Sequence, residues 1–156
     1  SDRDRLMKLC RASSSMPLAS PMVNIDGVPY LDGGVADSVP IRHALKSGNA
    51  KIIVVLTRNP GYRKKPVSKG TAKLYRKAYK SYPKMAACAV HRNRMYNRTM
   101  ELVEKLEAEG RIYVIRPMVP TVSRLERDYD KLMSFYEHGY ALMKKEYANL
   151  LRYMEE

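Results

Sequence analysis

Residues 51–57 read Lys51-Ile52-Ile53-Val54-Val55-Leu56-Thr57 and are followed by the turn sequence Asn59-Pro60-Gly61. A continuous run of β-branched and aliphatic residues, without polar residues at alternate positions, predicts a strand that is buried on both faces. Such strands are typical of mostly parallel sheets, because helices cover both faces of those sheets. The run therefore predicts an α/β fold.

The segments around this strand have the periodicity expected for that class. Residues 111–116 predict a second strand, which Pro117 stops. Helices are predicted from residue 4 to 14, in a short segment around residues 41–45, from residue 70 to 82, from Pro83 to Gly110, and through most of residues 118–156. The apolar faces expected on three of them are Leu6, Leu9, Cys10 and Ala12; Met95, Thr99, Leu102, Val103 and Leu106; and Leu125, Tyr129, Leu132, Met133, Tyr136, Tyr140, Met143, Tyr147, Leu150, Leu151 and Met154 around Gly139.

A short β-hairpin is predicted ahead of the central strand. Residues 22–25 and 28–31 flank Asp26-Gly27, a pair that favours the two positive φ angles of a tight hairpin turn. Pro29 has no N–H to donate, so its strand is expected at an edge. Because the two central strands alone make a thin sheet, we expect further strands from outside these residues.

The composition is that of one packed domain. The chain has 156 residues, of which 45% are hydrophobic and 29% charged, too apolar for a disordered segment. The longest aliphatic run, residues 52–56, is far shorter than the roughly 20 residues of a membrane span, and the charged amino end is no secretory signal. Cys10 and Cys88 predict buried free thiols rather than a disulfide framework, which favours the cytoplasm.

The positive charge is concentrated in one part of the sequence. The formal net charge is +13, and residues 58–98 contain 13 of the 29 Lys and Arg and no acid, which leaves 16 basic and 16 acidic residues elsewhere. Three interpretations are open: attraction to an anionic lipid surface, binding of nucleic acid, or a solvated face that acids outside these residues balance. The spacing of Tyr75, Tyr79 and Tyr82 places them on one apolar helix face, which favours packing over base stacking and makes nucleic acid the weaker partner.

The step Asp32-Gly33-Gly34 is the strongest candidate for chemistry. A carboxylate at the end of a strand, followed by two glycines, allows other backbone to approach it closely. Three blocks in order, residues 11–17, 30–40 and 54–62, resemble the bacterial patatin-like phospholipases, and a weaker resemblance continues to the Tyr-rich end. The resemblance implies the C-terminal part of a three-layer α/β/α patatin-like fold, with a mostly parallel sheet, a short β-hairpin and several helices.

The resemblance implies a lipid acyl hydrolase that cleaves carboxylic esters with a Ser-Asp dyad, of the phospholipase A or lysophospholipase type. Asp32 matches the dyad aspartate, whereas the Gly-x-Ser-x-Gly motif of the nucleophile does not occur in these residues. We therefore expect residues 1–156 to be the C-terminal portion of a single patatin-like domain that is inactive alone. Residues 1–61 are its catalytic-Asp region, and residues 62–156 are a basic, Tyr-rich helical region with one further strand. The alternative is a non-catalytic basic module that binds anionic membrane or nucleic acid.

Other polar residues receive supporting roles. Gly33, Gly34, Ser14 and Ser15 are expected in turns near Asp32, and Ser13 and Ser20 in turns and caps rather than as nucleophiles. Asp37 is expected as a helix cap, and His43, His91 and His138 as structural residues. The expected contacts with a lipid surface are Lys73, Arg76, Lys77 and Lys80. We expect a lipid-ester substrate, no cofactor and no metal, a cytoplasmic location with peripheral contact at the inner face of the membrane, and dimerisation through an exposed sheet edge.

Overall fold

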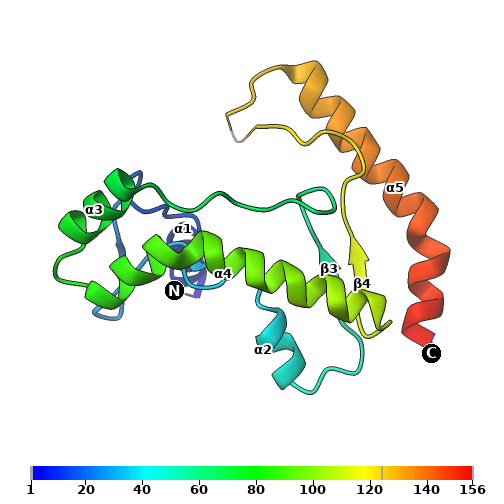
Figure 1. Cartoon of the computed structure of the whole chain (residues 1–156), viewed down its shortest axis with the longest axis horizontal. Coiled ribbons are helices and arrows are strands. Elements are labelled where there is room, and N and C mark those ends of the chain that lie inside the picture. The colour runs from blue at the N-terminus through cyan, green and yellow to red at the C-terminus, as the bar shows by residue number, and fades with distance from the viewer. Residues whose placement is uncertain (1, 124, 156) are drawn as a thin grey trace. The chain divides into compact units, whose positions relative to one another are not determined.

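The structure is a computed structural model that describes residues 2–123 and 125–155. It confirms the mixed α/β class, with an antiparallel hairpin, a parallel strand pair and several helices (Figure 1). In chain order the elements are α1 (Asp2–Ser13), β1 (Val23–Ile25), β2 (Val28–Tyr30), the 3-10 turn η1 (Gly33–Val35), α2 (Ile41–Lys46), β3 (Ile53–Val55), α3 (Lys69–Ala78), α4 (Pro83–Ala108), β4 (Tyr113–Ile115) and α5 (Tyr129–Glu155).

The chain forms two compact units, each assembled from two separate segments. The first unit comprises Ser1–Pro40 and Lys64–Thr99, and the second comprises Ile41–Arg63 and Met100–Glu156. Helix α4 contributes its first part to one unit and its last part to the other. The prediction that all residues belong to a single domain stays a prediction.

The hairpin of the first unit forms as its turn sequence predicts. Strands β1 and β2 pair antiparallel, with Val23 opposite Tyr30 and Ile25 opposite Val28. The turn residues Asp26 and Gly27 have φ angles of 52° and 81°, so both adopt the left-handed conformation that this turn requires. Asn24 supports the turn, because its side-chain oxygen accepts a hydrogen bond from the Gly27 N–H.

The core of the first unit lies between η1, α3 and α4. Its buried members are Val35, Tyr75, Tyr79, Ala86 and Ala89. Helix α3 begins at a capped end, where the Ser68 hydroxyl accepts the Thr71 N–H. Burial confirms packing for two of the three predicted tyrosines, Tyr75 within α3 and Tyr79 at its C-cap, whereas Tyr82, three residues further on, is exposed.

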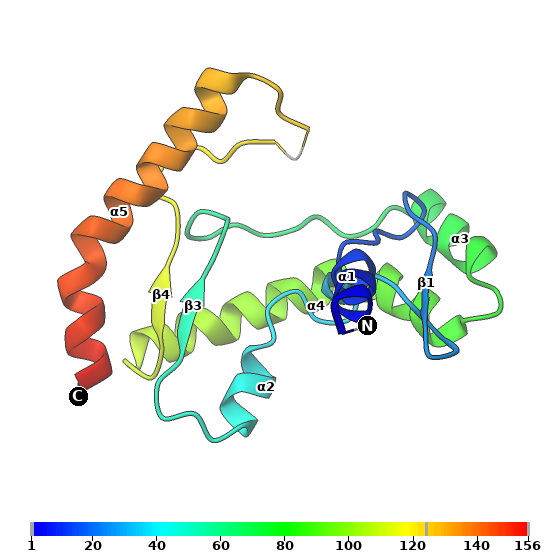
Figure 2. The ribbon, with the colours of Figure 1, turned by 180° about the vertical axis from the view of Figure 1, so that it is seen from behind.

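The second unit is built on the parallel pair of β3 and β4, which run side by side in Figures 1 and 2. Val54 lies opposite Val114 in the register of this pair. Helix α5 contacts β4, and its Tyr153 hydroxyl accepts the Ile52 N–H and donates to the Arg111 carbonyl. One tyrosine thus links α5 to the entrances of both strands.

Helix α4 ends as the sequence predicts. Gly110 has a φ of 69°, and hydrogen bonds from the Gly110 and Arg111 N–H groups to the Glu107 and Leu106 carbonyls close the last turn. Val103 and Leu106, both predicted to face inward, are buried. Met95 is a correction, since it is exposed and the buried face of α4 passes through Tyr96 and Met100 instead.

The predicted burial of β3 is wrong. The strand is shorter than residues 51–57, and only Val54 is buried, while Ile53 and Val55 are 40% and 70% exposed. Within the described residues β3 pairs with β4 alone. A strand that has one neighbour and no cover on one face leaves alternate side chains in water.

Three further expectations about burial need correction. Cys10 and Cys88 are free, as predicted, but both are exposed. On α1 only Ala12 of the predicted apolar face is buried. Leu125 lies in the loop before α5 rather than in a helix, and α5 continues through Gly139 without a buried residue among those described. Helical periodicity fixes which residues share a face, but it does not supply an element to cover that face.

Candidate functional site

Asp32 lies at the junction between the hairpin and η1 in the first unit. It caps η1, since its Oδ1 atom accepts the Gly34 N–H at 2.7 Å. Its backbone N–H donates to the Ser15 carbonyl at 2.8 Å. Two hydrogen bonds therefore fix both the main chain and one carboxylate oxygen of Asp32, and the side chain is half-buried. Among the described residues, no donor is hydrogen-bonded to its Oδ2 atom.

The two glycines after Asp32 differ in their surroundings. A Cβ atom at Gly34 would lie 3.0 Å from Asp32 Oδ1, whereas a Cβ at Gly33 would meet nothing within 4 Å. The carbonyl of Gly34 is also held, because it accepts a hydrogen bond from the Ser38 hydroxyl. The second glycine is thus needed for the approach of the backbone to the carboxylate.

The serines near Asp32 serve the end of α1. Ser14 donates its hydroxyl to the Cys10 carbonyl at 2.9 Å, and Ser15 donates to the Arg11 carbonyl at 2.8 Å. Both hydroxyls are bound to the last turn of the helix. Ser15 is 3% exposed, and its own carbonyl receives the Asp32 N–H. The serines therefore stabilise the end of α1, and Ser15 also holds the Asp32 loop through its carbonyl.

The Asp32 region is also connected to the basic helix α3. The Tyr79 hydroxyl accepts the N–H of Leu18, a residue with a φ of 67°, at 2.9 Å. Val35, three residues after Asp32, packs in the same core as Tyr75 and Tyr79. The tyrosine face of α3 therefore supports the segments on either side of the Asp32 loop.

The four predicted lipid contacts, three in α3 and Lys80 just past its end, are all exposed. Lys73, Arg76, Lys77 and Lys80 lie outside the buried Ala72, Tyr75 and Tyr79 face. The ion pairs in residues 2–123 and 125–155 include none of these four residues. None of the four is joined to Asp32 by a hydrogen bond or ion pair among the described residues, so the structure groups them in and just after α3 rather than around the carboxylate.

The remaining polar candidates lie in a turn and in helices. Asp37 accepts the Val39 N–H at 3.2 Å and so forms a local turn, which replaces the predicted helix cap. His43 lies in α2 and His91 in α4, and His138 accepts the Met118 N–H at its Nε2 atom. Within the described ranges no group of three or more His, Cys, Asp or Glu side chains could hold a metal ion.

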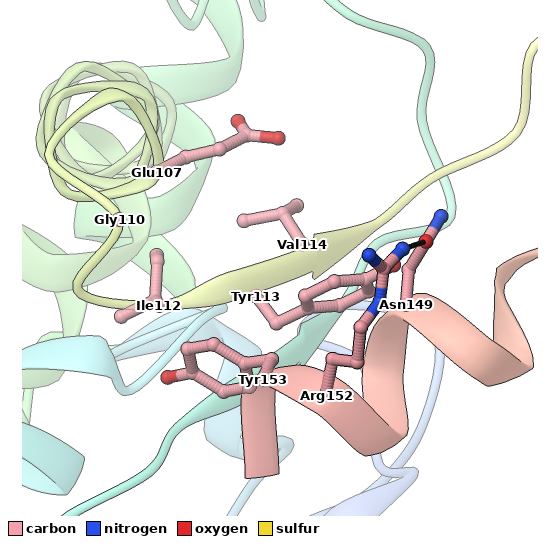
Figure 3. A pocket seen from close by; sticks show the side chains of 8 residues that line it. All are labelled: Glu107, Gly110, Ile112, Tyr113, Val114, Asn149, Arg152 and Tyr153. Atoms are coloured by element: carbon pink, nitrogen blue, oxygen red, sulfur yellow. Dashed lines mark hydrogen bonds between the residues drawn. The ribbon is translucent and has the colours of Figure 1, made fainter. Parts of the chain in front are cut away.

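The second unit contains a cavity of about 490 Å³ beside β4 and α5 (Figure 3). Its lining residues are Glu107, Gly110, Ile112, Tyr113, Val114, Asn149, Arg152 and Tyr153. The two tyrosine rings lie 5.5 Å apart at an angle of 42°, and Arg152 donates to Asn149. The polar side chains of the lining have hydrogen-bond partners, since Tyr113 donates to Glu146, Glu107 accepts from Arg116 and Tyr153 bonds to backbone. The cavity therefore resembles a packing junction more than a reaction site.

Electrostatics in this junction support that interpretation. The Tyr113 hydroxyl donates to Glu146 at 2.6 Å. Partial burial and this bond raise the pKa of Tyr113 to about 12, and the same bond lowers the pKa of Glu146. The pair therefore keeps one neutral donor and one charged acceptor near neutral pH, which favours a fixed hydrogen bond over proton transfer.

Sequence reasoning did not identify the contribution of Tyr79 and Val35 to the Asp32 region. The spacing of Tyr75, Tyr79 and Tyr82 indicated an apolar face, but a period cannot name the partner of that face. The one local signal was the apolar Val35, which comes directly after the two glycines.

Comparisons with known proteins match two separate parts of the chain. Residues 1–45 match the family model of patatin-like phospholipases, and residues 82–155 match a domain of unknown function, DUF6363. A segment of 52 residues is 35% identical to the uncharacterized protein YjjU of Escherichia coli (strain K12), which covers 33% of this chain and 15% of that protein.

The matched range bears on the resemblance predicted from the sequence. It includes the blocks at residues 11–17 and 30–40, but neither the block at residues 54–62 nor the Tyr-rich end. The carboxyl-terminal half of the chain is instead similar to a domain without an assigned function. The comparisons therefore support a relation to patatin-like phospholipases, which are lipid hydrolases, for residues 1–45, the segment that carries Asp32.

Proposed function

We propose that this chain supplies the catalytic aspartate, Asp32, of a serine hydrolase that cleaves carboxylic esters of lipids. The observation that carries the proposal is the state of the Asp32 carboxylate. One oxygen is held by the Gly34 N–H at 2.7 Å, the other has no hydrogen-bond donor among the described residues, and the residue lies in the segment related to lipid hydrolases.

This arrangement suits a base that acts directly on a serine hydroxyl. In the proposed reaction Asp32 Oδ2 accepts the serine proton while the serine oxygen attacks the ester carbonyl carbon. The proton then passes to the leaving alcohol, and water hydrolyses the acyl-serine. A free carboxylate is a weak base toward an alcohol, so fixed geometry and stabilisation of the oxyanion must provide most of the rate enhancement.

The nucleophile has to come from outside these 156 residues. Ser14 and Ser15 have their hydroxyls bound to the end of α1, and the sequence contains no Gly-x-Ser-x-Gly motif. The exposed apolar face of β3, which includes Ile53 and Val55, is consistent with further elements that pack on this strand. We infer that the active protein combines this chain with a segment that carries the serine.

The test uses the longest product of the gene that encodes this chain, assayed with a soluble chromogenic ester and with phospholipid. Asp32→Asn keeps the size of the side chain and its bond to Gly34 but removes the base, so kcat should fall by about 1,000-fold. Asp37→Asn is the matched control, because Asn can form the same local turn; its kcat should remain within about twofold.

Two results would contradict the proposal. One is turnover by Asp32→Asn at the level of the Asp37→Asn control. The other is a full gene product without a serine in a strand-turn-helix elbow. The 156-residue chain, purified alone, should release no fatty acid in the same assays.

A further inference from the structure

The outward face of α3, together with Lys80 just past its end, carries positive charge that the described residues do not neutralise. Lys69, Lys73, Arg76, Lys77 and Lys80 are exposed, and none is among the ion pairs of residues 2–123 and 125–155. The first unit as a whole has 15 basic and 5 acidic residues, a formal charge of +10. Like charges on one short helix repel one another, so an anionic surface would be a favourable counterpart.

The side chains between these charges indicate the kind of surface. Leu74 lies on the outward side of α3 and is 50% exposed, and Tyr82, just past the helix, is 43% exposed. An aliphatic side chain among Lys and Arg is suited to the boundary between lipid head groups and acyl chains. Lysine stems can also lie along apolar surface while their ammonium groups reach phosphate.

The same face is poorly suited to nucleic acid. Single strands are bound by successive aromatic side chains on which bases stack. Tyr75 in α3 and Tyr79 at its C-cap are each only 9% exposed and belong to the core with Val35, which leaves Tyr82 as the exposed tyrosine of residues 69–82. The charge pattern alone would fit either polyanion, but the buried tyrosines favour a lipid surface.

We propose that the outward face of α3 is a docking surface for anionic lipid bilayers, which brings the Asp32 loop to the lipid that it acts on. This proposal rests on the proposed ester hydrolase, since it places the lipid substrate of that enzyme in the bilayer. The connection is structural: the inward face of α3 packs against Val35, and its Tyr79 bonds to Leu18. A single helix therefore joins the charged face to the candidate site.

The experiment measures binding of the 156-residue chain to sonicated vesicles by flotation. Vesicles of neutral phosphatidylcholine are compared with vesicles that contain 30 mol% phosphatidylglycerol, a fraction chosen to be of the order found in anionic membranes. The variant replaces Lys73, Arg76, Lys77 and Lys80 with Gln. Each basic residue near an anionic surface strengthens binding by about fivefold, so we expect a loss on the order of 100-fold or more after salt screening.

The matched control removes the same charge elsewhere. Arg3, Lys8, Arg42 and Lys46 are exposed residues of α1 and α2, and their replacement by Gln should change vesicle affinity by less than about fivefold. Far-ultraviolet circular dichroism is recorded for both variants, and a variant of Lys77→Gln alone, which should lose about fivefold, provides the result if the fourfold variant does not fold.

Three outcomes would overturn the docking surface. The first is no preference for the anionic vesicles, and the second is an equal loss of vesicle affinity in the two fourfold variants. The third, with both partners measured across one salt series, is tighter binding of a 20-nucleotide single strand than of vesicles at every salt concentration. Because flotation requires no turnover, these outcomes are independent of the Asp32→Asn assay. If Asp32→Asn keeps its activity while the chain still binds anionic vesicles, the proposed role of Asp32 is wrong but the docking surface on α3 stands.

Discussion

The two units of this chain differ in how their charges are arranged. The first unit has a formal charge of +10, whereas the second has 14 basic and 11 acidic residues and a formal charge of +3. Of the six ion pairs among residues 2–123 and 125–155, five lie in the second unit, including those of Arg63 with Glu104 and of Arg116 with Glu107. In the first unit the basic residues of α3 are left exposed to solvent, and hydrogen bonds from Gly34 and to Ser15 hold the Asp32 loop.

The difference indicates a division of tasks. Charged groups in ion pairs and hydroxyls in hydrogen bonds stabilise a fold, but few of them remain available to bind a ligand or to react. Unpaired like charges on one helix repel one another, which is unfavourable for folding, but they are available to bind an anionic partner. The first unit therefore carries the candidate functions, and the second resembles a supporting structure around β3, β4 and α5. Three changes should break or sharpen this contrast.

The largest effect is expected from the core of the second unit. Leu106 is 2% exposed, so Leu106→Ala should lower the free energy of unfolding by about 3 kcal/mol through lost burial and a cavity. Leu132→Ala, at a side chain 41% exposed in α5, should cost less than about 1 kcal/mol. Amide hydrogen exchange should locate the lost protection in the second unit, and equal losses in the first would mean that the two units unfold together.

A smaller effect is expected at the glycine pair of the first unit. Gly34→Ala places a Cβ atom 3.0 Å from Asp32 Oδ1, and displacement of the carboxylate should lower kcat of the active protein by about 10- to 100-fold. Gly33→Ala, whose Cβ would meet nothing within 4 Å, should stay within about threefold. Equal activities of the two variants would mean that the bond from Gly34 to Asp32 does not position the base.

The smallest effect concerns the paired charges of the second unit. The bond from Arg63 holds the pKa of Glu104 below its ordinary value of 4.5, so the folded state favours the charged carboxylate. This stabilisation is present above pH 4.5 and is lost as the pH falls through the folded pKa. For an exposed pair it should be below about 1 kcal/mol.

Urea unfolding from pH 7 to pH 3 measures this contribution. Glu104→Gln should be less stable than the wild type at pH 7, and the gap should close at the acid end. Glu101→Gln, at an exposed position of the same helix, should show no gap at either pH. A gap for Glu104→Gln that is constant with pH would assign the effect to packing rather than charge.

Much of the local structure could be predicted because its cause is local. Asp26-Gly27 formed the hairpin turn, and Gly110 ended α4, since both positions need backbone angles that few residues accept. The spacing of Tyr75 and Tyr79 identified the inward face of α3. For the site, the sequence singled out Asp32 and the two glycines, and the comparisons support the family relation over residues 1–45.

Burial was predicted less well than secondary structure. The run at residues 51–57 predicted a strand covered on both faces, yet Val55 is 70% exposed, and Cys10 and Cys88 are exposed too. The apolar face of α5 has no buried residue among those described. An apolar pattern states what a segment can bury, but the amount buried depends on which other elements pack against it.

The sequence by itself determined the hairpin turn, the end of α4, the inward position of Tyr75 and Tyr79, the uneven distribution of charge and the identity of the candidate base. Only the tertiary structure decided that Gly34 rather than Gly33 constrains Asp32, that Ser14 and Ser15 bond to α1, and that the tyrosines of α3 support the Asp32 region. The physical reason is the sequence separation over which each kind of interaction acts. Backbone angles and periodicity depend on neighbours in the chain, whereas these contacts join segments that are distant in sequence or depend on the final position of a side chain.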